Sequence, residues 1–155
     1  MKEQPIQDRI EREIEIKAPV ARVWKALTDH EQFGVWFMVK LEGPFQLGKI
    51  TKGLTTYKGF EHVKFWAKVT KLEHHRVFSY EWHPYAVEKG ADYSKEHPTT
   101  VEFTLEKTAS GTSLKVIETG FKSLPKDRQV DAFRANEGGW EAQLRNIEVY
   151  VAKNP

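Results

Sequence analysis

The chain has 155 residues, a formal net charge of +2 and no cysteine. This length predicts a single domain over residues 1–155. The absence of cysteine excludes disulfides, thiolate nucleophiles and thiolate iron–sulfur sites. The small net charge gives no sign of a nucleic-acid partner or a membrane partner, and basic and acidic residues are interspersed along the chain.

The N-terminal segment is polar, reads MKEQPIQDRIER, and lacks the apolar core of a secretory signal. No apolar run is long enough to span a bilayer, so a cytoplasmic protein without membrane insertion is expected. Five Trp, five Tyr and nine Phe make the chain rich in aromatic residues. Such side chains bury large areas and line ligand pockets.

The first part of the chain predicts one strand followed by two short helices. Residues 9–17 alternate isoleucines with charges, which is typical of a half-buried strand. Pro19 then favours a helix start. Apolar residues recur at helical spacing in two groups, namely Val20, Val23, Trp24 and Leu27, then Phe33, Trp36 and Phe37.

From residue 39 onward the pattern predicts strands. A hairpin is expected from residues 39–45 and 48–56 around Gln46-Leu47, and further strands are expected over residues 63–73, 76–83, 99–107 and 112–121. Short turns between consecutive strands favour an antiparallel sheet and an α+β fold. Residues 84–98 form a loop that is long for a hairpin connection, so it is either functional or mobile.

The C-terminal stretch predicts a long helix from about Pro125 to Lys153. Its apolar stripe consists of Val130, Phe133, Trp140, Leu144, Ile147 and Val151. Gly138-Gly139 interrupts this helix beside Trp140, where each glycine costs about 1 kcal/mol relative to alanine. Two interpretations stay open: a break between two shorter helices, or small residues that leave room for something to approach the backbone.

Four segments together resemble the helix-grip (START-like, SRPBCC) superfamily: IEIKAPVARVWKALTD, FSYEWHPYA, VEFTLEKTASGTSLKVIETGF and NEGGWEAQLRNI. Within it, the chain is similar to the group related to the activator of heat-shock-protein-90 ATPase. The resemblance implies an α+β fold with a curved antiparallel sheet of six to seven strands around the C-terminal helix, and a cavity between them. It implies binding of a small apolar or aromatic molecule, lipid-, hormone- or polyketide-like. The alternatives are a cyclase or hydrolase, and a chaperone-activating interaction domain.

Glu118 is the first candidate for a functional residue. It shares the parity of Leu114 and Val116, so it is expected to point toward the helix. A buried carboxylate must be paired, hydrogen-bonded or protonated. It is either a polar anchor or acid/base inside the cavity, or a structural residue that is exposed at an edge or paired with an arginine. The structural interpretation is preferred, because buried ion pairs also perturb carboxylates.

Asn136 and Glu137 flank Trp140 by about 40° and 60° on a helical wheel, so both can reach a cavity from the helix. Glu118 and Glu137 can then converge, and paired carboxylates can share acid and base roles. The resemblance places Trp36, Tyr80, Trp82 and Trp140 around the cavity. The predicted ligand-binding set is Trp36, Tyr80, Trp82, Glu118, Phe133, Asn136, Glu137, Gly139 and Trp140.

No catalytic residue is assigned, and no cofactor is expected. The histidines show no metal-ligand spacing, so no metal site is predicted. Trp66 stands between Lys64 and Lys68 in the opposite parity to Phe65, which predicts an outer-face position. It is a candidate contact if the chain forms a weak homodimer rather than a monomer.

Overall fold

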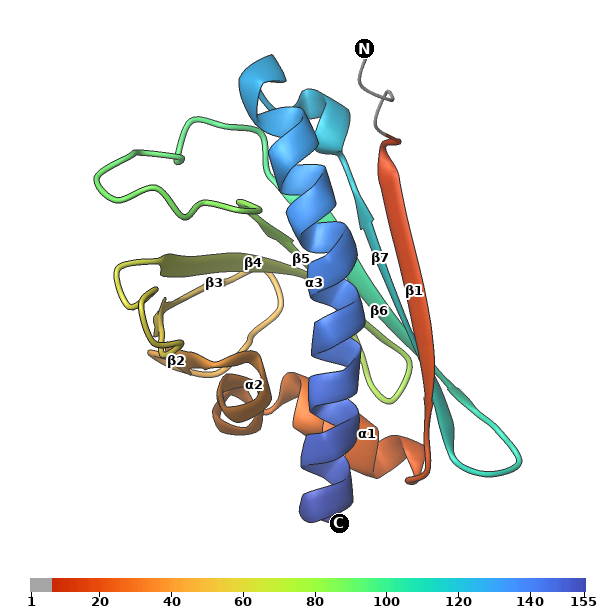
Figure 1. The fold of residues 1–155 in the computed structure, drawn as a ribbon. Helices are drawn as coiled ribbons and strands as arrows, with labels where there is room; N and C mark the ends of the chain where they lie inside the picture. The colour runs from red at the N-terminus through yellow and green to blue at the C-terminus, as the bar shows by residue number, and fades with distance from the viewer. Residues whose placement is uncertain (1–6) are drawn as a thin grey trace.

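The computed structural model describes residues 7–155; residues 1–6 of the polar N-terminal segment lie outside the described part (Figure 1). The chain begins with β1 (Arg9–Ile16), α1 (Val20–Thr28) and α2 (His30–Phe37). Six strands follow: β2 (Val39–Leu41), β3 (Ile50–Thr55), β4 (Lys64–Glu73), β5 (Val77–Trp82), β6 (Thr99–Lys107) and β7 (Thr112–Thr119). A 3₁₀ turn (Phe121–Ser123) leads into α3 (Lys126–Lys153). The predicted α+β fold is confirmed.

The strands form one seven-stranded antiparallel sheet in the order β1-β7-β6-β5-β4-β3-β2. Figure 1 shows that α3 runs along one face of this sheet, and that α1 and α2 lie near the C-terminal end of α3. A sheet that is covered on one face alternates buried and exposed positions. β6 and β7 follow this alternation over most of their length.

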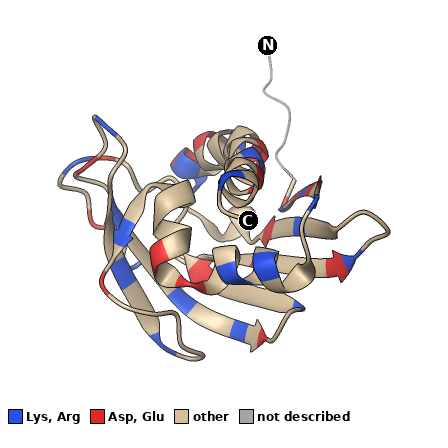
Figure 2. Cartoon of the chain, turned by 90° about the horizontal axis from the view of Figure 1, so that it is seen from below, with Lys and Arg blue, Asp and Glu red and all other residues tan. Residues whose placement is uncertain are grey.

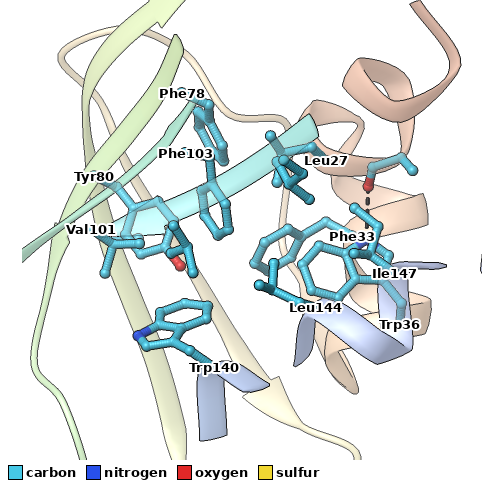
Figure 3. Packing of buried hydrophobic residues seen from close by; sticks show 14 of the residues in the cluster. Leu27, Phe33, Trp36, Phe78, Tyr80, Val101, Phe103, Trp140, Leu144 and Ile147 are labelled. Atoms are coloured by element: carbon cyan, nitrogen blue, oxygen red, sulfur yellow. Dashed lines mark hydrogen bonds between the residues drawn. The ribbon is translucent and has the colours of Figure 1, made fainter. Parts of the chain in front are cut away.

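The core lies between α3 and the sheet. Trp140, Leu144 and Ile147 of α3 are all buried, as predicted for the helical stripe. They face aromatic side chains of the sheet such as Tyr80 and Phe103, and the rings of Phe103 and Trp140 meet edge to face at 5.6 Å (Figure 3). This packing fixes the rotation of α3 about its axis, and therefore which of its polar residues face the sheet.

Two strand boundaries differ from the prediction. The hairpin pairs only Val39–Leu41 with Ile50–Thr55, and residues 42–49 form its connection. β7 ends before Gly120, whose φ of 105° is a left-handed conformation that suits glycine. The chain turns there, so Phe121 leaves the strand and packs against Phe133 of α3, with ring centroids 5.3 Å apart.

α3 is one continuous helix through Gly138-Gly139, as predicted for the long C-terminal helix, so of the two open interpretations the break between two shorter helices is wrong. Two glycines cost about 2 kcal/mol of helix propensity. Burying a single large apolar side chain of the stripe on each side of them offsets that cost. A Cβ placed at either glycine would meet no neighbouring element of the protein within 4 Å, so close packing does not require a glycine at either position.

Gly138→Ala and Gly139→Ala are therefore each expected to raise the free energy of unfolding by up to about 1 kcal/mol, because alanine restores helix propensity without meeting a neighbour. Urea denaturation measures the change. Gly34→Ala is the control: its Cβ would lie 2.4 Å from the Val39 carbonyl oxygen, so this variant should be destabilised. Destabilisation by Gly139→Ala would show that this position needs the space.

Candidate functional site

Glu118 is a buried carboxylate inside the sheet. It lies on β7, paired with Ile10 of β1 on one side and with Val101 of β6 on the other. Its side chain is 0% exposed, and like Leu114 and Val116 it belongs to the buried positions of the strand. The inward direction predicted from parity agrees with this burial.

Four neutral donors surround the Glu118 carboxylate. Trp82 Nε1 of β5 donates to Oε2 over 2.7 Å, and Thr99 Oγ1 of β6 donates to the same oxygen. From α3, Trp140 Nε1 and Asn136 Nδ2 donate to Oε1 over 2.7 and 2.8 Å. Each carboxylate oxygen thus accepts two hydrogen bonds, which occupies its lone pairs. Glu118 ties α3 to three neighbouring strands.

No cation accompanies Glu118 among residues 7–155, since none of their ion pairs includes it. Burial raises the pKa of Glu118, and the four hydrogen bonds oppose that rise. Indole N–H groups only donate, so both tryptophans favour the ionised carboxylate. The preferred structural interpretation is wrong in both its forms: β7 lies between two strands rather than at an edge, and neutral donors take the place of an arginine.

The Tyr80 hydroxyl lies near this network and has no hydrogen-bond partner in the described chain. Tyr80 pairs with Val101, which in turn pairs with Glu118, so all three lie in one row across the sheet. Figure 3 shows the Tyr80 hydroxyl on the side of the ring that faces Trp140. Burial, and then the charge of Glu118, raise the pKa of Tyr80 well above its usual value. Tyr80 is therefore a neutral donor that is free for one further polar atom.

A pocket of about 710 Å³ lies between the β3–β5 end of the sheet and residues 84–98, which we call the strap. Phe37, Phe65 and Trp82 form its aromatic inner wall. Rings of Phe65 and Trp82 lie 6.1 Å apart, and Phe37 packs against both. Because Trp82 lines this pocket and also donates to Glu118, the pocket ends at the carboxylate network.

Arg128 in the first turns of α3 holds both ends of the strap. Its Nε and Nη2 donate to the Glu96 carboxylate over 2.9 and 2.8 Å. Its Nη1 donates to the Tyr85 carbonyl over 2.8 Å, and its Nη2 to the Pro84 carbonyl over 2.9 Å. The guanidinium also lies 4.6 Å from the Tyr93 ring centroid. The planar fork of arginine is suited to this set of acceptors, which fixes the strap at its base.

The outer wall of the pocket contains Trp66 and His83, whose rings pack 4.9 Å apart. Trp66 is half-buried because His83 packs on it, so it is not the freely exposed contact that its parity suggested. Burial lowers the pKa of His83, which keeps its ring neutral at neutral pH. His62 Nε2 lies 2.8 Å from the Val87 carbonyl oxygen, which joins the middle of the strap to the β3–β4 connection.

Five of the nine predicted ligand-binding residues meet at the network: Tyr80, Trp82, Glu118, Asn136 and Trp140. Trp36 donates to the Ala26 carbonyl and joins α2 to α1 instead. Phe133 and Glu137 face β1, and Glu137 lies 3.7 Å from Arg12 at a half-exposed position. Glu137 therefore does not pair with Glu118. Gly139 has open space around it, and only Trp82 of the nine lines the pocket.

Sequence reasoning missed Thr99 and Arg128. Thr99 lies opposite Trp82 in the β5–β6 register, which no local pattern reveals. Arg128 had a detectable signal: it stands four residues before Ala132 and eight before Asn136, on the side of α3 that faces the protein. A basic residue at that spacing indicates a cation that is buried or held against the protein by acceptors.

Residues 7–155 contain no group of His, Cys, Asp and Glu that could hold a metal ion. Among the described helices, none has the length and apolar character needed to cross a membrane.

Solved structures share this fold. MLL2253 from Mesorhizobium loti is 22% identical with a TM-score of 0.75, over 95% of this chain and 98% of that chain. CalU16 from Micromonospora echinospora is 20% identical with a TM-score of 0.64, over 92% of this chain and 75% of that one. DynU16, a protein in the dynemicin biosynthetic locus, is 20% identical with a TM-score of 0.73, over 96% and 49%. At these identities the likeness shows the fold alone.

A search of curated proteins found no match. A family model, described as "Activator of Hsp90 ATPase homolog 1-like protein", matches residues 17–152, which is most of the chain. The match includes every element from α1 to the last turn of α3, and therefore the whole Glu118 network. The chain thus belongs to the family of activator of Hsp90 ATPase homolog 1-like proteins, with a helix-grip fold.

Proposed function

We propose that this chain binds a small apolar or aromatic molecule in the pocket between the β3–β5 end of the sheet and the strap. No residue of α3 lines this pocket, so it differs in place from the expected cavity between sheet and C-terminal helix. The observation that carries the proposal is a pocket of about 710 Å³ whose aromatic inner wall ends at a buried polar network. Pockets that bind small molecules typically have volumes of about 300–1,000 Å³, apolar walls and a few convergent polar groups.

The walls favour a planar ligand. Phe37, Phe65 and Trp82 present ring faces and edges, and aromatic pairs gain about 0.5–1.5 kcal/mol beyond the area that they bury. Tyr80, the neutral donor that still lacks a partner, does not line the pocket but packs against Trp82, with ring centroids 5.6 Å apart. The preference for a planar apolar ligand therefore rests on the wall residues. A small-molecule ligand is also compatible with the similar DynU16, which comes from the dynemicin biosynthetic locus.

Binding is preferred to the cyclase or hydrolase alternative because of the state of Glu118. A general base needs a free lone pair within reach of the substrate. Four donors occupy those of Glu118, and Glu137 lies toward Arg12 instead. The pocket volume also favours binding over a chaperone-activating domain, for which a small cavity is expected.

Ala86→Phe is expected to weaken binding of the neutral aromatic probe N-phenyl-1-naphthylamine at least tenfold. Ala86 lies on the strap and lines the pocket, so a phenyl group there occupies ligand volume without entering the core. Fluorescence titration measures the affinity. Ala142→Phe, at an exposed position of α3, is the matched control and should bind as the wild type does.

Equal probe affinity in folded Ala86→Phe and in the wild type would show that the probe does not bind in this pocket, which contradicts the proposal. Native mass spectrometry of the freshly purified protein gives an independent readout. A co-purified small molecule is expected in the wild type and should be reduced in Ala86→Phe.

A further inference from the structure

The charge of this chain is unevenly distributed, although its total is small. Residues 38–71 contain seven lysines and two glutamates, a net charge of +5, so the other residues together carry −3 to give the total of +2. Figure 2 shows this arrangement as blue positions along the strands at the β2–β4 side of the sheet. The expectation that basic and acidic residues are interspersed is wrong for this segment.

The strand register gathers four of these seven lysines on the side of the sheet that faces away from α3. Leu54 of β3 pairs with Lys40 of β2 and with Lys64 of β4, and Ile50 pairs with Lys68. Period-two alternation puts Lys52 on the same side, since Thr51 and Gly53 are buried and Ile50, Lys52 and Leu54 are exposed. We call Lys40, Ile50, Lys52, Leu54, Lys64 and Lys68 the basic outer face.

The lysines of this face are available for a partner. None of the ion pairs among residues 7–155 includes Lys40, Lys52, Lys64 or Lys68. Ile50 and Leu54 between them are 50% and 53% exposed. Exposed large apolar side chains flanked by unpaired lysines indicate a surface with a partner that is both anionic and apolar.

We propose that the basic outer face docks on an anionic lipid surface. Lysines reach the headgroup charges while their alkyl stems follow the apolar boundary, and Ile50 and Leu54 enter the boundary between headgroups and acyl chains. The charge of each lysine near such a surface contributes about fivefold in affinity. Lys64 also lines the ligand pocket, so the docked surface would adjoin the pocket entrance.

Two other partners fit this face less well. Binding of single-stranded nucleic acid relies on exposed aromatic rings for base stacking. Trp66, the aromatic residue that the strand register places among these lysines, already packs on His83, and the exposed rings of Tyr57 and Phe60 lie outside the strands, in the β3–β4 connection. A symmetric contact with a second copy of the chain would bring the unpaired lysines of both copies together, which repel.

Co-sedimentation with vesicles tests the proposal. The wild type is expected to bind phosphatidylcholine vesicles that contain about one-third phosphatidylserine, and the affinity should fall as the salt concentration rises. It should not bind vesicles of pure phosphatidylcholine. The double variant Lys40→Gln/Lys52→Gln should bind about 25-fold more weakly, because two lysine contributions are lost. Leu54→Ser should also weaken binding severalfold, because less apolar surface enters the bilayer.

The matched control is Lys122→Gln/Lys126→Gln, which removes two exposed lysines near the start of α3 and changes the net charge equally. It should bind vesicles as the wild type does. Three results would overturn the proposal: equal weakening by the control pair, no binding to the anionic vesicles, or binding to a single-stranded oligonucleotide without binding to vesicles.

Discussion

Glu118→Gln is expected to lower the free energy of unfolding by about 2–4 kcal/mol, because the four surrounding donors require a side chain with two accepting oxygens. Whichever way the amide is oriented, its NH₂ group faces an indole N–H, either that of Trp82 or that of Trp140. Neither indole can accept, so two donors face each other and one indole loses its partner. Urea denaturation at neutral pH measures the change.

Glu106→Gln is the control for this substitution. Glu106 is exposed on β6, and its replacement should change stability by less than about 0.5 kcal/mol. Unchanged stability of Glu118→Gln would contradict the network. The same variant also reports on the pocket: if Trp82 loses its hydrogen bond to Glu118, the inner wall loosens and probe affinity should fall as well.

The pH dependence of this penalty follows from the pKa of Glu118, which burial raises in the folded state above the value of 4.5 for the free group. The folded protein then binds this proton more tightly than the unfolded chain does. Stability from this group is fully present below about pH 4.5 and is lost as the pH rises through the folded-state pKa. Glutamine does not titrate, so the penalty for Glu118→Gln should shrink from pH 4 to pH 7. A penalty that grows would show that the four donors outweigh burial.

The sequence was sufficient for the fold because hydrophobic periodicity is local. Parity along β7 also predicted the inward direction of Glu118. Its partners were not predictable in the same way, because Thr99 and Trp82 depend on the register of β5 and β6. Asn136 was named from the helical wheel, since helix rotation follows from the apolar stripe, whereas Trp140 was placed at the site by the family resemblance.

Glu137 and Gly138-Gly139 show where local rules failed. Glu137 lies on the β1 side of α3, so it contacts Arg12 rather than Glu118. The glycines lower helix propensity, but propensity is a weak prior that the packing of Trp140 and Leu144 overrides. The pocket depends on the strap, whose path has no periodicity and is set by contacts distant in sequence, above all with Arg128.

Arg128→Met is expected to lower the free energy of unfolding by about 2 kcal/mol and to weaken probe binding at least tenfold. The Glu96 side chain is only 14% exposed, so loss of the guanidinium leaves a largely buried carboxylate without its cation. Partial exposure of the pair keeps the cost below that of a fully buried one. The carbonyls of Pro84 and Tyr85 lose their donor too, so both ends of the strap are released.

A double-mutant cycle separates the interaction of Arg128 with Glu96 from general effects of the substitution on α3. Glu96→Gln removes the buried charge, so Arg128→Met should cost less in the Glu96→Gln background than in the wild type. Arg134→Met, at an exposed position two turns further along α3, should leave both stability and probe affinity unchanged. Arg128→Lys should recover part of the stability through its charge but little of the probe affinity, because an ammonium group cannot contact Glu96 and both carbonyls in one planar fork. Full recovery by lysine would mean that charge alone, rather than the geometry of the fork, positions the strap over the pocket.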